Sequence, residues 1–317
     1  MKKISSKSKR RERRDERSST LAAAIPLIGF LLFGVLPLLL ATIVAFTELH
    51  TTDLSEMKFV GVKNFITILT NQDDGRTYAS YLSTIVFTLN VPICIGLSLY
   101  IANMVNRTKV GKSLFRAIFF IPYVCSTVVV AITFKILFAN DGGVINTVLV
   151  KLGFEPRGWL TDSPMSFMMV AVVLSVWMGL GFCIVLFSAS LANVDSSYYE
   201  SARLDGATPF QMFWKITLPA ISPTTAYLIT MRLIGSLQTM TETYILIGGA
   251  SKAPVWPGSA AYVSDTVVKH IYNMVFVASY KYGYGLAAAA GWILATIVFI
   301  ITQINLKLQD RWVNYDF

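Results

Sequence analysis

Residues 191–220 read LANVDSSYYESARLDGATPFQMFWKITLPA and lie between long apolar stretches of the chain. A short helix should start near Ser197, because Ser197 and Glu200 have the spacing of a capping box, in which each side chain bonds the other residue's backbone N–H. Asp195 or Ser196 is an alternative cap for the same helix. The segment therefore begins with a helix of its own.

The second half of this segment predicts a second helix. Gly206 supplies the left-handed residue at which helices often end. Thr208, Pro209 and Gln211 then restart a helix with a cap, a first-turn proline and a capping box. Pro219 should end it, since proline has no N–H to donate within a helix. The sequence thus predicts a helix, a glycine turn and a helix.

Uncharged stretches make up most of the remaining chain, at 21–47, 77–106, 117–134, 163–194, 216–231 and 282–306. A helix needs roughly 20 apolar residues to cross a bilayer. Ser222 and Pro223 should start the fifth helix; Arg232 interrupts its stretch, and the apolar pattern then resumes to about residue 248. Charged residues are only 14% of the 317, and the mean hydropathy is +0.58, which excludes an ordinary soluble protein. We expect an all-α membrane protein with six transmembrane helices.

Basic residues are distributed unevenly along the chain. Residues 1–20 form a basic tail with nine Lys or Arg against three acids, and residues 21–317 form the transmembrane domain. With the amino terminus inside, the inner segments hold 17 basic residues and the outer segments hold eight. The positive-inside rule then predicts that both termini are cytoplasmic. No stacking aromatics are interleaved in the tail, which excludes nucleic acid as a partner and favours anionic lipid.

The outer segment 259–277 alternates apolar and polar residues in a loosely helical pattern that ends in aromatics. It predicts a helix lying along the outer membrane interface.

The 195–219 loop resembles the EAA motif of permease subunits in type I binding-protein-dependent ABC importers. The residues that carry the resemblance are Glu200, Ala202, Gly206, Ile216, Leu218 and Pro219, with Asp205 and Ala207 around the glycine. Ser201 departs from the pattern, which usually has alanine there. The wider run 198–219 is similar to the carbohydrate branch of the family, the maltose and multiple-sugar permeases.

This resemblance implies a permease fold whose loop helix inserts into a cleft on a separate ATPase. The residues it implies for this coupling are Glu200, Ser201, Ala202, Asp205, Gly206 and Pro219. It also implies a second homologous permease subunit, two ATPase subunits, an extracytoplasmic solute-binding protein and a sugar substrate. The expected location is the bacterial cytoplasmic membrane. ATP and Mg would be held by the ATPase, so this chain is expected to have no cofactor.

Motifs for catalysis are weak in this chain. Residues 111–113 fit the end of a phosphate-binding loop, but Asn106 stands where its first glycine should be. The two histidines, His50 and His270, lie far apart, which gives little support to a metal site or to histidine-based catalysis. We therefore expect a transport subunit and not an enzyme.

Three ionisable residues fall within the predicted spans: Lys135, Arg232 and Glu242. Such residues are costly in lipid and suggest function. Lys135 and Glu242 fall near outer helix ends, where solvent is close. Arg232 lies 13 residues beyond Pro219, roughly 20 Å along a helix and near mid-membrane. It needs a partner, a water-filled cavity or a substrate.

A sugar presents hydroxyls at its edges and C–H faces between them, so its path needs hydrogen-bonding groups beside flat apolar surfaces. The fourth and fifth helices supply this mixture in Ser175, Trp177, Phe182, Arg232, Ser236, Gln238 and Thr239. Resemblance to the maltose-importer permease implies a sugar site at Ser175, Met178, Gly179, Phe182, Arg232, Gly235, Ser236 and Thr239. Only Gly179 keeps the residue type, so maltose itself is not implied. Asn90 and Pro92 could mark a kink or gate.

Three other functions stay open at this stage. Arg232 would suit an ABC importer for a phosphorylated polyol or another anionic solute. Glu242 and Arg232 would suit an ion-coupled secondary transporter. A membrane-embedded structural partner without transport is the third.

Overall fold

The computed structural model describes residues 23–70, 75–108, 111–247, 254–257, 262–277 and 279–314. The predicted basic tail lies outside these ranges. The described part is almost wholly helical, with two short antiparallel strands, β1 (Thr47–Glu48) and β2 (Lys58–Phe59). In chain order the helical elements are η1 (Leu31–Val35, π-helical), α2 (Leu36–Ala45), η2 (Leu54–Glu56, 3-10), α3 (Lys63–Leu69), α4 (Arg76–Thr88), α5 (Asn90–Arg107), α6 (Lys112–Val124), α7 (Thr127–Leu137), α8 (Val144–Lys151), α9 (Pro164–Ala192), α10 (Ser196–Leu204), α11 (Pro209–Met212), η3 (Phe213–Thr217, π-helical), α12 (Leu218–Ala220), α13 (Ser222–Leu237), α14 (Thr241–Ile247), α15 (Val267–Phe276) and α16 (Ser279–Gln309).

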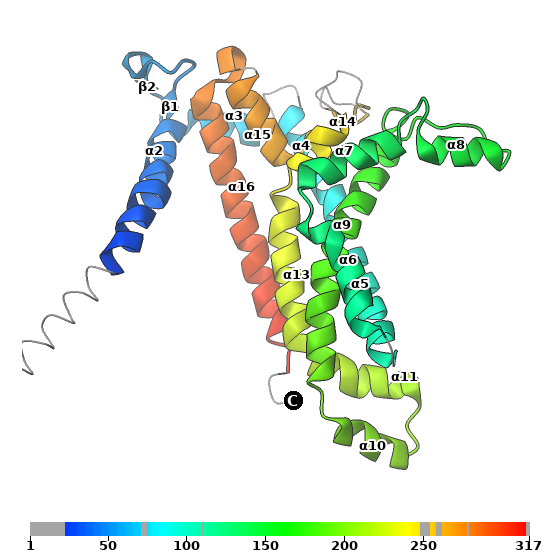
Figure 1. Cartoon of the computed structure of the whole chain (residues 1–317). Coiled ribbons are helices and arrows are strands. Elements are labelled where there is room, and N and C mark those ends of the chain that lie inside the picture. The colour runs from blue at the N-terminus through cyan, green and yellow to red at the C-terminus, as the bar shows by residue number, and fades with distance from the viewer. Residues whose placement is uncertain are drawn as a thin grey trace, which may run out of the picture.

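The long helices form a bundle with two distinct ends (Figure 1). Helices α10 and α11 project from one end, and we call residues 195–219 the elbow. The opposite end carries α7, α8, α14, α15 and the strand pair. Helix α2 stands apart and packs mainly on α16 (Figure 1).

Among the described residues, four helices are long and apolar enough to cross a membrane: Ala23–Ala45, Arg76–Arg107, Pro164–Ala192 and Tyr282–Gln309. They correspond to the first, second, fourth and sixth predicted spans. The fourth starts as a capped helix: Ser163 caps α9 by accepting from the Ser166 backbone N–H at 3.1 Å, and Pro164 occupies its first turn.

The third predicted span is not straight. Helices α6 and α7 meet at 94°, whereas the apolar run 117–134 predicted a single helix. Pro122 lies in the last turn of α6, and Cys125 just after it has extended backbone. Because proline removes a helical hydrogen bond, the chain can bend here with little further loss. The pair is one broken span or a re-entrant turn.

The fifth predicted span is also interrupted. Helix α13 has 16 residues, about 24 Å of helix, and ends at Leu237, before α14 begins at Thr241. The backbone between α13 and α14 is stabilised by a residue distant in sequence, since Thr266 Oγ1 donates to the Thr239 carbonyl at 2.7 Å. The continuous helix expected to residue 248 is therefore wrong. The count of six spans stays a prediction.

Helix α9 forms the centre of the bundle and packs against α5, α6, α4, α13, α14 and α7. About half of its side chains, Leu174 and Phe187 among them, are buried. Gly181 allows α9 to pack closely on α6, because a Cβ there would lie 2.3 Å from the Phe119 carbonyl oxygen of α6. This packing fixes the face of α9 that meets α13.

The predicted interfacial helix begins later and is more deeply packed than expected. Helix α15 starts at Val267 and lies against α4 and α16, while residues 258–261 lie outside the described part. The Lys269 ammonium lies 2.9 Å from the Asp265 carboxylate, with both side chains only 8% exposed. This helix is thus part of the bundle at the opposite end from the elbow.

Candidate functional site

The first helix of the elbow is capped by Asp195. Its Oδ1 accepts from the Ser197 backbone N–H at 2.9 Å, and α10 follows. The Ser197–Glu200 capping box is therefore wrong and the Asp195 alternative is confirmed, because Asp195 lies one residue before the helix. The hydrogen bonds from the Ser197 backbone and side chain hold the pKa of Asp195 below its ordinary value. Glu200 points to solvent and has no hydrogen bond among the described residues.

The turn of the elbow follows the sequence prediction. Gly206 has φ +74°, a left-handed conformation, with no atom near the position of a Cβ. Thr208 and Gln211 form the expected capping box, with contacts of 3.3 and 2.8 Å, and Pro209 opens α11. Leu204 beside the turn is 90% exposed. The tip of the elbow is therefore an apolar side chain that the described part of the chain leaves exposed to solvent.

The second helix ends one residue after Pro219. Helix α11 continues through η3 into α12, which stops at Ala220, and the chain turns at Ile221. Ser222 is not the cap of α13, since its hydroxyl donates to the Pro219 carbonyl at 2.7 Å. Tyr199 of α10 and Thr217 of η3 share a hydrogen bond of 2.9 Å. The elbow is thereby joined to the base of α13.

Arg232 lies at the centre of a polar cluster between α5, α9 and α13. Its Nη2 donates to Asn90 Oδ1 at 2.7 Å and to the Ser175 carbonyl and Oγ at 3.2 and 3.3 Å. Asn90 Nδ2 in turn donates to Ser236 Oγ at 2.8 Å. Gly179 makes room for the guanidinium, because a Cβ there would lie 2.6 Å from Arg232 Cζ. Four of the predicted site residues therefore meet around one positive charge.

Every partner of this guanidinium is neutral. No acid within the described ranges lies in salt-bridge distance of Arg232, and its buried Nε has no hydrogen-bond partner there. A buried, unmatched donor costs free energy unless water or a ligand satisfies it. The cluster therefore has a free donor and an uncompensated charge to offer.

The other predicted site residues lie around this cluster in different settings. Trp177 is half-exposed, with its ring 5.6 Å from that of Phe134, and Phe182 stacks on Tyr123 at 5.1 Å. Met178 packs against the buried core. The remaining three lie along the end of α13: Gly235 and Gln238 are exposed, and Thr239 is buried.

Asn90 is the central residue that sequence reasoning placed only as a kink or gate. It is fully buried, and its partner Ser236 lies 146 positions away in sequence. The available signal was an amide in the middle of an apolar run, since a buried amide needs partners. Of the other two membrane ionisable residues, Lys135 lies in the last turn of α7 and Glu242 accepts from Thr239 Oγ1 at 2.6 Å.

A helical bundle with an elbow projecting from one end and a polar cluster between its helices is the architecture expected of a permease, the membrane subunit of a transport system. Residues 93–314 match the family model described as the inner membrane component of binding-protein-dependent transport systems. The chain belongs to this family, as its resemblance predicted, and the family gives no support to an ion-coupled secondary transporter.

Named relatives and a solved structure agree with this family. The probable ABC transporter permease protein YesP of Bacillus subtilis is 33% identical over 92% of this chain and 89% of its own length. The arabinooligosaccharides transport system permease protein AraP of the same organism is 31% identical, covering 90% of this chain and 86% of its own. A crystal structure of a bacterial alginate ABC transporter, in complex with an alginate pentasaccharide-bound periplasmic protein, contains a chain with the same fold. The TM-score is 0.77 at 24% identity, covering 94% of this chain and 96% of that one.

Proposed function

We propose that this chain is the permease subunit of an ATP-driven importer that moves a sugar or oligosaccharide across the cytoplasmic membrane. The observation that carries the proposal is the polar cluster around Arg232, which lies between α5, α9 and α13 in a chain of this family. The arabinooligosaccharide system of its relative AraP supports a carbohydrate substrate.

The Arg232 cluster suits a hydroxyl-rich solute. The guanidinium and Asn90 hold donors and acceptors in fixed positions, and a sugar hydroxyl can exchange with either. Trp177 and Phe182 offer ring faces on the same helix, against which the C–H face of a sugar can pack. The proposed path of the sugar continues along the end of α13 and the residues after it, past Gly235, Gln238 and Thr239.

The elbow is proposed as the coupling element. Its exposed Glu200, Ser201 and Asp205 surround the tip at Leu204, so carboxylates and an apolar side chain are available to a soluble partner. Two copies of a separate ATPase, which would hold ATP and Mg, are the proposed source of energy. The substitution Glu200→Lys should abolish sugar-stimulated ATP hydrolysis while the subunit stays in the membrane, because it opposes a basic site on the ATPase.

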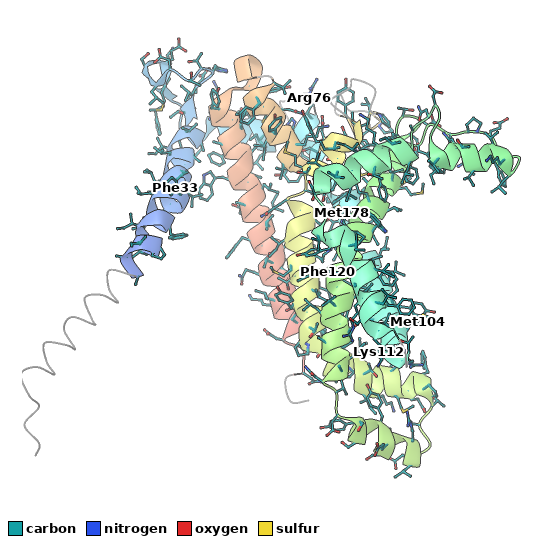
Figure 2. The ribbon with its side chains drawn as sticks, viewed as in Figure 1. Phe33, Arg76, Met104, Lys112, Phe120 and Met178 are labelled. Carbon is teal, nitrogen blue, oxygen red and sulfur yellow. The ribbon has the colours of Figure 1, made fainter. Side chains whose placement is uncertain are left out.

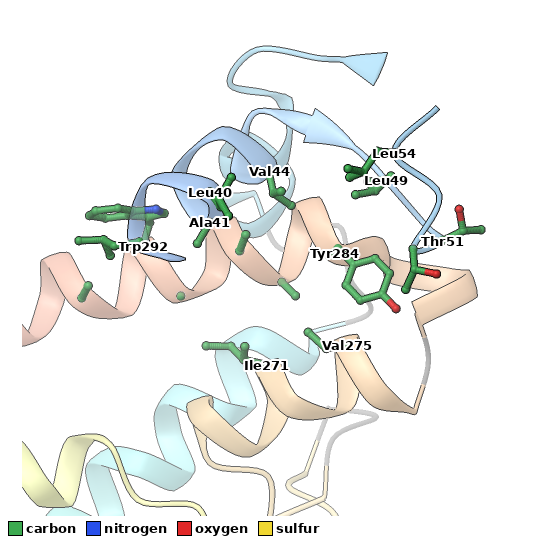
Figure 3. Close-up of a pocket in the computed structure, with 16 residues that line it drawn as sticks. Leu40, Ala41, Val44, Leu49, Thr51, Leu54, Ile271, Val275, Tyr284 and Trp292 are labelled. Carbon is green, nitrogen blue, oxygen red and sulfur yellow. The ribbon is translucent and has the colours of Figure 1, made fainter. Parts of the chain in front are cut away.

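A second, homologous permease is the proposed partner within the membrane. Helix α2 is exposed on nearly all sides, and a pocket of 620 Å³ opens between it, α15 and α16 (Figure 3). Leu40, Val44, Ile271 and Trp292 line this pocket, and its surface is overwhelmingly apolar (Figure 3). Large exposed apolar surfaces mark contacts with other helices or lipid. A binding protein would deliver the solute on the outer side, and both termini would be cytoplasmic.

An anionic solute is the second candidate, and the uncompensated charge of Arg232 favours it. An arginine can bind a carboxylate or phosphate through two parallel hydrogen bonds.

Uptake by the assembled transporter in proteoliposomes tests both candidates. Radiolabelled arabino-oligosaccharides, lactose and maltodextrins, offered with the binding protein and internal ATP, should include a transported solute, and uptake should stop without ATP. Transport of a phosphorylated polyol in place of every neutral sugar would establish the anionic alternative. Uptake driven by a proton or sodium gradient without the ATPase would contradict both.

A further inference from the structure

A pocket of 480 Å³ lies at the elbow end of the bundle, apart from the Arg232 cluster. One wall is the end of α5, with Asn103, Asn106 and Arg107, and the other is the inner side of the elbow, with Arg203 and Met212. Figure 2 shows Met104 and Lys112 close to the same end of the bundle. The pocket thus spans the junction between the membrane bundle and the elbow.

This pocket is strongly basic. Arg107 and Arg203 both line it, and within the described ranges neither guanidinium has an ion-pair or hydrogen-bond partner. None of its lining residues is acidic. Two arginines without counter-charges on one cavity form a site for an anion.

Two further cations reinforce the α5 wall. The Lys112 ammonium donates to the Asn106 carbonyl at 2.7 Å, and Arg116 Nη2 donates to Asn106 Oδ1 at 3.2 Å. Since the amide oxygen is engaged, Asn106 has its amide N–H groups left to donate. The wall therefore presents positive charge and the amide N–H groups of Asn106.

The rest of the pocket is apolar. Leu191, Met212 and Phe213 line it, and the hydroxyls of Tyr199 and Thr217 bond to each other. A bare inorganic anion would leave this surface uncovered, whereas an anion with an organic body would cover it. Arginine binds carboxylates and phosphates through parallel hydrogen bonds, and a phosphate has enough oxygens to accept from two arginines at once.

We propose that this pocket binds a phosphate ester, whose phosphate lies between Arg107 and Arg203 and whose organic part lies against Met212 and Phe213. Two sources share this chemistry: the headgroup of an anionic phospholipid, and a soluble phosphorylated metabolite. A bound ester ties the end of α5 to the elbow through one ligand. It therefore regulates how freely the elbow moves relative to the bundle, which goes beyond sugar transport itself.

The test measures binding to the purified, assembled transporter without sugar or ATP, so that it is independent of the transported solute. The probes are a fluorescent phosphatidylglycerol, with zwitterionic phosphatidylcholine as the reference, and glycerol 3-phosphate as a soluble competitor. Phosphatidylglycerol should bind more tightly than phosphatidylcholine, because the choline cation of the latter is repelled by the two arginines. Displacement by low concentrations of glycerol 3-phosphate identifies a soluble ester as the natural ligand, and no displacement identifies the lipid.

Variants decide whether this pocket is the site. The double substitution Arg107→Gln with Arg203→Gln should weaken binding of the ester by about 25-fold, because each arginine near a lipid phosphate contributes roughly fivefold. Lysine at both positions should retain part of the affinity. Arg311→Gln removes an exposed arginine near the end of α16, outside the pocket, and should leave binding unchanged.

A variant that keeps both arginines provides an independent test. Met212→Phe fills part of the cavity and should weaken lipid binding without altering the charge of the pocket. The subunit stoichiometry of each purified complex checks its assembly. Equal affinity in the wild type and the double glutamine variant would overturn the proposal. So would an equal loss in Arg311→Gln, or a wild-type complex that binds neither phosphate ester.

Discussion

Replacing Gly179 with alanine should displace Arg232 from α9 without unfolding the bundle. The new Cβ would lie 2.6 Å from Arg232 Cζ and Nη1, where ordinary contact begins at 3.4 Å, so the guanidinium must retreat by about 0.8 Å. Its bonds to the Ser175 carbonyl and Oγ, already 3.2 and 3.3 Å long, would then be lost. Hydrogen bonds to charged groups contribute about 1.5–3 kcal/mol. The alanine lowers the cost of the helix by up to about 1 kcal/mol, which offsets part of this loss.

The expected result is a weaker apparent affinity for the transported sugar, by roughly tenfold, with normal assembly. Sugar-stimulated ATP hydrolysis by the purified complex measures the affinity, and thermal unfolding measures stability. Gly235→Ala is the matched control, because nothing lies within 4 Å of its added Cβ and it should behave as wild type. In an Arg232→Met background, Gly179→Ala should have no further effect. An unchanged affinity in Gly179→Ala, or an equal loss in Gly235→Ala, would refute the reasoning.

Four other predictions address coupling, charge, packing and topology. Gly206→Val should uncouple ATP hydrolysis from transport, because a branched residue at φ +74° costs about 1–2 kcal/mol, whereas Gly206→Asn, which tolerates this conformation, should transport; equal activity of the two would contradict a role for the turn. Arg232→Lys should keep assembly but change the order of preference among sugars, and a wild-type preference would mean that charge alone suffices. Lys269→Met should destabilise the complex by about 3–5 kcal/mol in thermal unfolding, since it strands a buried carboxylate, and an unchanged melting temperature would show that the site is hydrated. In a cysteine-free background, Ser201→Cys should resist an impermeant thiol reagent in intact cells and Ser55→Cys should react; the reverse pattern would invert the topology.

The parts of the fold that sequence predicted well are those fixed by neighbours in the chain. Thr208, Pro209 and Gln211 form a local signal for a helix start and Gly206 one for a helix end, so the elbow could be predicted from spacing alone. The start of α10 was less certain, because Asp195 and Ser197 are both good caps and only the structure shows which one the chain uses.

The interruptions of the third and fifth spans could not be derived in the same way. An apolar run reports that a segment is buried in lipid or protein but not that it is straight. The turn after Leu237 depends on Thr266, a residue far along the chain, and hydropathy carries no such information. Pro122 and the polar residues after Gly235 were the local signs of these bends.

Sequence analysis predicted most members of the polar cluster, including Arg232, but not the part that Asn90 plays in it. Arg232 and Ser175 stood out as a charge and a hydroxyl in apolar surroundings. Asn90 became central only when α5 was placed beside α9 and α13, because a buried amide is judged by neighbours that the sequence does not order.

The helical run from Pro209 through η3 and α12 ends at Ile221, where α13 begins, so a tilt of α13 can be centred on that turn. Arg232 lies eleven residues beyond Ile221, about 16 Å along the helix axis. A tilt of only about 4° at the elbow end carries the guanidinium by about 1 Å at that radius. That distance is enough to stretch its 2.7 Å contact with Asn90 beyond hydrogen-bonding range. A small tilt of α13 about its elbow end is therefore enough to open or close the polar cluster.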